Sequence, residues 1–156
     1  MDEAVTKPAA DKPEESLPIS IKVKWIDGLR FVASDYKGHS IIMDVSEEHG
    51  GEGSGFGPMQ LLLAAFGGCT GIDVIEILRK QRQKPEGLEI MVSGERVSEP
   101  PRVYSKVHVE YRVKGKGFKE KALKRAIQLS QDKYCSVGTT LKAKGEVTYN
   151  HIMQQI

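Results

Sequence analysis

One segment constrains the fold more than any other: residues 58–83 have the pattern of one long helix whose first half is apolar on every face. Pro58 suits the first turn of a helix, and Pro85 and Gly87 end the pattern. The run Leu61–Phe66 leaves no polar side for water. A single small sheet covers only one face of such a helix. We therefore expect a second copy of the chain to enclose the rest.

Strand patterns surround this helix and predict the α+β class. Residues 21–45 alternate apolar and polar side chains in three short runs, which predicts an antiparallel meander. Asp27-Gly28 predicts a type I′ turn between the first two runs, and Lys37-Gly38 predicts the second turn. Two longer strands, a second helix and a last strand follow, at residues 88–92, 107–113, 118–134 and 146–151. The predicted order is β-β-β-α-β-β-α-β.

Length and charge set the domain organisation and limit the partners. The 156 residues suffice for one domain with its own core, which we expect at residues 18–156. Residues 1–17 are charged and contain proline, which predicts a disordered tail. A net charge of +2 does not indicate nucleic acid as a main partner, and no uninterrupted apolar run approaches the ~20 residues that cross a bilayer. Two cysteines and an acidic N-terminus without a secretory pattern predict a cytoplasmic protein.

Motifs for other chemistry are weak. The glycine-rich segment at residues 50–58 matches neither GxGxxG nor GxxxxGK[ST], so we interpret it as a mobile connection into the long helix. A mobile flap over a site is the functional alternative. The scattered histidines and the lack of CxxC predict no metal site and no cofactor. His108 alternates with valines and is expected on a solvated strand face.

Cys69 is the first candidate for chemistry. It follows Gly67-Gly68 inside the long helix, where each glycine costs about 1 kcal/mol relative to alanine, so close approach of another backbone or a ligand is expected. Thr70 and Asp73 come next, which places the Cys69 thiol at a boundary between core and cavity. The alternative is a buried free cysteine that acts as a small hydrophobic residue. Cys135 directly follows the second helix, and its context alone has no specific meaning.

The surroundings of both cysteines resemble a known family. The segment Gly57–Cys69 resembles the central-helix signature of the OsmC/Ohr superfamily, and residues 133–137 match the region of its second cysteine. The resemblance covers roughly residues 20–152 and points to the YhfA-like branch. It implies an intertwined homodimer, with each long helix buried between two curled sheets and the active sites at the subunit interface.

The resemblance also implies an activity. In the peroxidase members the first cysteine, here Cys69, attacks the distal oxygen of an organic hydroperoxide and becomes a sulfenic acid. The second, here Cys135, condenses with it to a disulfide. A dithiol reductant, lipoyl or thioredoxin-like, then restores the two thiols. No cofactor is implied.

One departure from the family pattern leaves the function open. Peroxidase members carry a glutamate in the first turn after the proline, paired with an arginine that supports the thiolate. Here Met59 and Gln60 occupy those positions, although Gln60 can still form hydrogen bonds. Arg30 is the candidate arginine, and its structural alternative is a solvated strand residue. Two hypotheses follow: an organic hydroperoxide reductase, or a non-catalytic dimeric protein that binds a small apolar ligand. A third hypothesis, a dimeric scaffold for a protein partner, is favoured by no sequence feature of its own.

Overall fold

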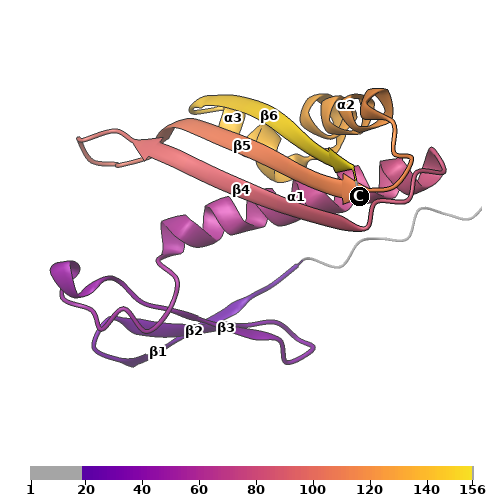
Figure 1. The fold of residues 1–156 in the computed structure, drawn as a ribbon. Helices are drawn as coiled ribbons and strands as arrows, with labels where there is room; N and C mark the ends of the chain where they lie inside the picture. Colours follow the sequence, from indigo (N-terminus) through magenta and orange to yellow (C-terminus); the bar gives the residue numbers. More distant parts are fainter. Residues whose placement is uncertain (1–18, 156) are drawn as a thin grey trace, which may run out of the picture. The chain divides into compact units, whose positions relative to one another are not determined.

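The computed structural model describes residues 19–155, and its mixture of helices and antiparallel and parallel strands confirms the predicted α+β class (Figure 1). This part of the chain falls into two compact units that divide between Gly55 and Phe56, and each is described by itself. The predicted tail, residues 1–17, lies outside the described residues. The assignment of residues 18–156 to one domain stays a prediction.

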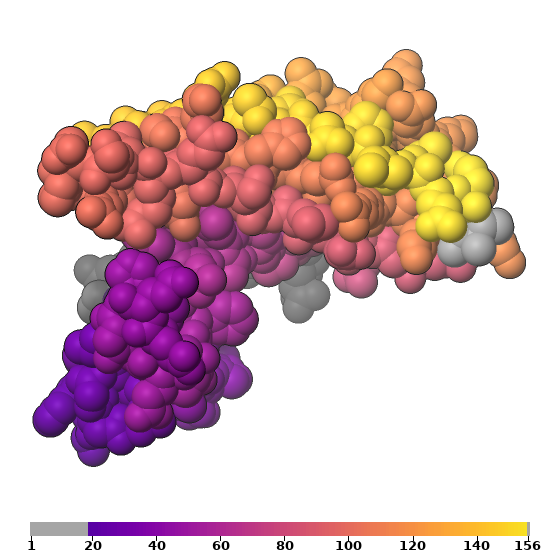
Figure 2. Space-filling model, turned by 60° about the vertical axis from the view of Figure 1, so that its left-hand side comes forward, coloured from indigo at the N-terminus to yellow at the C-terminus, as the bar shows by residue number. Residues whose placement is uncertain are grey.

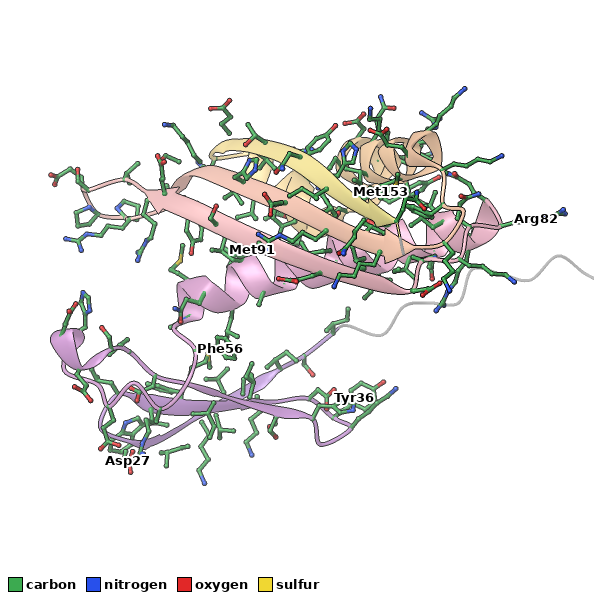
Figure 3. The ribbon with its side chains drawn as sticks, in the orientation of Figure 1. Asp27, Tyr36, Phe56, Arg82, Met91 and Met153 are labelled. Atoms are coloured by element: carbon green, nitrogen blue, oxygen red, sulfur yellow. The ribbon has the colours of Figure 1, made fainter. Side chains whose placement is uncertain are left out.

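The first unit contains the predicted three-stranded meander. Its antiparallel strands lie in the order β1 (Lys22–Asp27), β2 (Arg30–Ser34) and β3 (Ser40–Met43). Figure 3 shows Asp27 and Tyr36 near the turns at opposite ends of this sheet. The predicted type I′ turn is wrong, because Asp27 already pairs with Arg30 and only Gly28 of the two predicted turn residues has a positive φ, +45°. Gly28 and Leu29 therefore form the loop.

Asp44 organises the glycine-rich connection that follows β3. Asp44 is 1% exposed, and its carboxylate accepts hydrogen bonds from the backbone N–H groups of Val45, Glu52 and Ser54 at 2.8, 3.2 and 3.0 Å. The Ser54 hydroxyl donates a fourth, at 2.9 Å. Gly51 lies so close that a Cβ there would stand 2.6 Å from an Asp44 oxygen. The predicted mobile connection is corrected up to Ser54, since a buried carboxylate holds this segment.

The second unit is built on the sheet β4-β5-β6, whose strands span Gly87–Arg96, Tyr104–Gly115 and Glu146–Gln155. Central β5 runs antiparallel to β4 and parallel to β6. Valine and tyrosine side chains of β5 alternate with polar ones, so one face is buried and the other is solvated. The prediction for His108 is confirmed, since it lies exposed on the solvated face. In Figure 2 the yellow atoms of β6 follow the surface of this unit.

Three helices lie against the buried face of this sheet: α1 (Pro58–Lys80), α2 (Glu120–Leu129) and α3 (Ser136–Lys142). A π-helical turn, Ser130–Tyr134, extends α2 toward Cys135 and completes the predicted second helix. The sequence prediction missed α3, which is too short to show a helical period. It also extended the long helix past its observed end at Lys80.

Only one face of α1 is buried within the described chain. Phe66, Thr70, Val74 and Leu78 are fully buried at four-residue spacing, whereas Ile72 is 65% exposed. Although it contains no uninterrupted apolar run of the length that crosses a bilayer, α1 is long and apolar enough on average to cross a membrane, by length and composition only. Its packing against the sheet makes it the core helix of this unit.

Candidate functional site

The two cysteines meet in the second unit. Cys69 lies in the middle of α1 and is half-buried, whereas Cys135 lies between the π-helical turn and α3 and is 1% exposed. Both are free thiols. Their Sγ atoms and a carboxylate oxygen of Asp73 all lie within 4.8 Å of one another. The fold thus brings together two candidate residues that are far apart in the sequence.

Cys135 is fixed by its place at the start of α3. It is the residue that caps this helix, and its Sγ accepts a hydrogen bond from the backbone N–H of Gly138 at 3.3 Å. A Cβ at position 138 would stand 2.8 Å from the Phe66 ring and 3.3 Å from Sγ. Glycine at 138 therefore lets α3 approach both the core and the thiol.

Burial keeps the Cys135 thiol protonated. Loss of hydration, together with hydrogen bonding and charge from Cys69 and Asp73, raises the pKa of Cys135 to about 12. The hydrogen bond from the Gly138 N–H acts in the opposite direction and lowers this pKa. A thiol must lose its proton to act as a nucleophile. Cys135 is therefore unsuited to react first and becomes competent when its surroundings or its partner sulfur change.

A buried chain of hydrogen bonds ends on Asp73. Ser130 Oγ donates to Asp73 Oδ2 at 2.8 Å and lies 2.8 Å from Thr70 Oγ1. Thr70 Oγ1 in turn lies 2.6 Å from the Tyr111 hydroxyl, to which Gln131 Nε2 donates at 2.7 Å. Each hydroxyl has one proton, so the bonds run in a single direction, from Gln131 to the carboxylate. This order orients Asp73 as an acceptor beside the two thiols.

Gln60, the third candidate, lies at the beginning of α1. Its Oε1 accepts a hydrogen bond from the backbone N–H of Gly57 at 2.8 Å, so its side chain caps the helix. The exposed Gln60 side chain also stands at one end of a groove of about 460 Å³ between α1 and β4. The structure gives Gln60 a capping role, and a part in chemistry stays a prediction.

The two helical glycines before Cys69 have different surroundings. A Cβ on Gly67 would meet a side-chain methyl of Val92 in β4 at 3.2 Å, so the close neighbour is a side chain and not the backbone or ligand that was expected. Gly68 has open space around it and lines the groove. The other lining residues are Gln60, Leu63, Ala64, Gly67, Ile90 and Val92. An open apolar surface therefore runs up to the residue that precedes Cys69.

Arg30, the fourth candidate, belongs to the first unit. Its guanidinium donates to Asp27 from Nε at 2.6 Å and pairs with Glu52 through Nη1 at 3.0 Å. The hydrogen bond from Arg30 holds the pKa of Asp27 below its ordinary value. Asp27 and Glu52 thus hold this arginine. Neither lies in the first turn of the long helix, where the peroxidase members have their glutamate. Its proposed support of Cys69 stays a prediction.

Asp73, Ser130 and Gly138 contribute to the site without having been predicted as site residues from the sequence. A signal existed for Asp73, because its position four residues after Cys69 places both on one face of a helix. Ser130 and Gly138 reach the site only through the packing of α2 and α3 on α1, which no local pattern predicts.

The chain matches known proteins over most of its length. Residues 51–150 match the family described as OsmC-like protein. Protein YhfA of Escherichia coli K12 is 37% identical over 131 residues, covering 83% of this chain and 94% of YhfA. The crystal structure of a hypothetical protein from Aquifex aeolicus is similar with a TM-score of 0.74 at 29% identity, over 89% of this chain and 99% of that one.

The chain is also similar, in fold alone, to a protein named for organic hydroperoxide resistance. The organic hydroperoxide resistance protein OsmC of Legionella pneumophila gives a TM-score of 0.67 at 14% identity, covering 87% of this chain and 98% of the other. At this identity the likeness concerns the arrangement of strands and helices alone.

Proposed function

Since this chain belongs to the OsmC-like protein family, we propose that it is a thiol-dependent peroxidase that reduces organic hydroperoxides through Cys69 and Cys135. The single observation that carries the proposal is the approach of the two thiol sulfurs to within 4.8 Å, one half-buried and one buried. A disulfide requires a further approach of the two sulfurs, to about 2.05 Å. The fold shared with a protein named for organic hydroperoxide resistance adds support.

The reaction assigns one role to each sulfur. The Cys69 thiolate attacks the distal peroxide oxygen, so that an S–O bond forms, the O–O bond breaks, and the alkoxide takes a proton to leave as an alcohol. Cys135 then loses its proton and attacks the sulfenic sulfur, so that the S–S bond forms, the S–O bond breaks, and the leaving hydroxide takes that proton to become water. A dithiol reductant, lipoyl or thioredoxin-like, supplies two electrons and two protons to restore both thiols. Arg30 is proposed to favour the Cys69 thiolate, and Gln60 to hold the entrance to α1 in place.

The substrate preference follows from the groove beside Cys69. Leucine, isoleucine and valine side chains line much of it, and Gly68 has open space around it. An alkyl or aryl peroxide gains from burying its apolar part against this surface, whereas hydrogen peroxide has no such part. We therefore expect organic hydroperoxides to react faster.

The proposed active form is a cytoplasmic homodimer. Its support is apolar surface that the described chain leaves uncovered: Ile72 on α1 is 65% exposed, and Trp25 and Ile42 on the first sheet are 60% and 46% exposed. Exposed apolar faces of this kind are typical of obligate interfaces. A second copy of the chain is the partner expected from the long apolar helix.

Replacing each cysteine separately tests the two roles. We expect Cys69→Ser to abolish peroxide turnover, because no nucleophile remains to form the S–O bond. Cys135→Ser is expected to consume one peroxide per chain and stop as a sulfenic acid, detected as a dimedone adduct by mass spectrometry. Ser136→Ala, an exposed neighbour, is the matched control and should turn over like the wild type. Full activity in Cys69→Ser would refute the proposal.

The groove also favours a second candidate, a non-catalytic protein that binds a small apolar ligand. Its volume of about 460 Å³ lies within the range of small-molecule sites. This function predicts thiols of ordinary reactivity and a ligand that purifies with the protein. Native mass spectrometry of the dimer decides between the two: an empty dimer with fast thiols excludes the binding protein.

A further inference from the structure

Three metal-ligating side chains converge at the cysteine pair. Cys69 and Asp73 lie one turn apart on the same face of α1, and Cys135 reaches them from the start of α3. The two sulfurs and a carboxylate oxygen lie within 4.8 Å of one another. Two sulfurs bound to one zinc ion at about 2.3 Å lie less than about 4.6 Å apart, so a small side-chain rotation brings this cluster into coordination range.

Two of the three groups, Asp73 and Cys135, are held by hydrogen bonds as metal ligands usually are. Ser130 Oγ donates to Oδ2 of Asp73 at 2.8 Å and is itself held by the buried chain of Thr70 and Tyr111. The Gly138 N–H donates to the sulfur of Cys135 at 3.3 Å. Hydrogen bonds of this kind orient ligands and increase metal affinity. Asp73 keeps a second carboxylate oxygen that forms no hydrogen bond within residues 19–155.

The ligand chemistry selects the class of metal. Two thiolates with one carboxylate suit a thiophilic ion such as Zn²⁺, whereas Mg²⁺ and Ca²⁺ require oxygen ligands throughout. A divalent cation would also offset two of the three negative charges that two thiolates and Asp73 would place in one partly buried spot. Binding must then displace both thiol protons into solvent.

We propose that the reduced protein binds one Zn²⁺ ion per chain through Cys69, Asp73 and Cys135. The sequence predicts no metal site, because these three ligands do not follow a local motif. Zinc binding and the Cys69–Cys135 disulfide are mutually exclusive, since both use the same two sulfurs. The ion therefore protects the thiols, and oxidation of the pair releases it.

The test is a metal titration of the full-length, phosphine-reduced protein. Co²⁺ should give thiolate-to-cobalt charge-transfer absorption that saturates at one ion per chain, and Zn²⁺ should displace it. In competition with a chromophoric chelator, Asp73→Asn should weaken Zn²⁺ binding by at least about tenfold, and Cys135→Ser by more. Glu76→Gln, an exposed acid on the same helix, is the matched control and should bind as the wild type does.

Further measurements distinguish loss of metal binding from misfolding and from loss of peroxidase activity. Ser130→Ala leaves every ligand in place and should weaken binding several-fold by freeing Asp73. Diamide-oxidised protein should bind no Zn²⁺. Absence of stoichiometric binding, equal affinity in Asp73→Asn and wild type, or binding by the oxidised protein would each overturn the site. Because peroxide turnover is measured on metal-free protein, zinc binding without turnover would support the site while refuting the proposed function.

Discussion

Gly138 determines how closely Cys135 approaches the core. A methyl group at this position would stand 2.8 Å from the ring of Phe66 and 3.3 Å from the Cys135 sulfur. The same residue donates its N–H to that sulfur. A single glycine thus sets both the packing of α3 and the environment of the buried thiol.

We expect Gly138→Ala to destabilise the protein by about 1–3 kcal/mol, because the added methyl overpacks a filled site. Thr140→Ala, on the exposed side of the same helix, should change stability by less than about 0.5 kcal/mol. Chemical denaturation measures both. Equal stability of Gly138→Ala and wild type would show that α3 shifts freely and does not fix Cys135.

Both cysteines could be selected from the sequence alone, whereas their surroundings could not. The flanks of Cys69 and Cys135 resemble a family pattern, and that resemblance marks the two residues. The roles of Ser130 and Gly138 depend on the contact of three helices, and a local pattern carries no information about it. In the sequence Asp73 marks only the point where the long helix becomes more polar, because a helix face with one cysteine and one acidic residue is common.

Among the elements, the glycine-rich connection is held by one carboxylate. Hydrogen bonds to Asp44, led by the backbone N–H of Ser54, lower the pKa of this buried carboxyl to about 2. The folded protein therefore favours the ionised form more than the unfolded chain does, whose pKa is about 3.9. The resulting stabilisation is complete above the unfolded pKa and is lost as the pH falls toward about 2.

We accordingly expect the wild type to lose more stability between about pH 5 and pH 2.5 than Asp44→Asn, which has no proton to gain there. The asparagine variant should be less stable at neutral pH, and the two curves should converge in acid. Urea denaturation at stepped pH gives both curves. Parallel curves would contradict the assignment of Asp44 as the group that holds the connection.

The elements with strong periodicity were predicted well. Alternation identified β1–β3 and the central β5, and the apolar run after Pro58 identified α1. Prediction failed where tertiary contacts decide the local structure. The glycine-rich segment appeared mobile because its partner Asp44 precedes it in the chain, and the turn after β1 shifted by one residue because Asp27 stays in the ladder.

At the scale of the whole molecule, the uncovered side of α1 indicates assembly. A helix with one buried face and an exposed Ile72 is stable in water when another surface covers it. We predict a dimer by light scattering, and we predict that Ile72→Glu shifts it toward monomer because a charge would be buried. Lys121→Glu, on the exposed surface of α2, should stay dimeric. A wild type that is monomeric at high concentration would contradict the proposed assembly.

The most direct test of the proposed reaction at Cys69 and Cys135 is a stopped-flow measurement on reduced, metal-free wild-type protein. Cumene hydroperoxide and hydrogen peroxide are compared while thiol loss is followed, and peptide mapping identifies the product. We predict rapid, stoichiometric oxidation by the organic peroxide, slower oxidation by hydrogen peroxide, and a Cys69–Cys135 disulfide. Oxidation no faster than that of a free thiol, or a product without this disulfide, would contradict it.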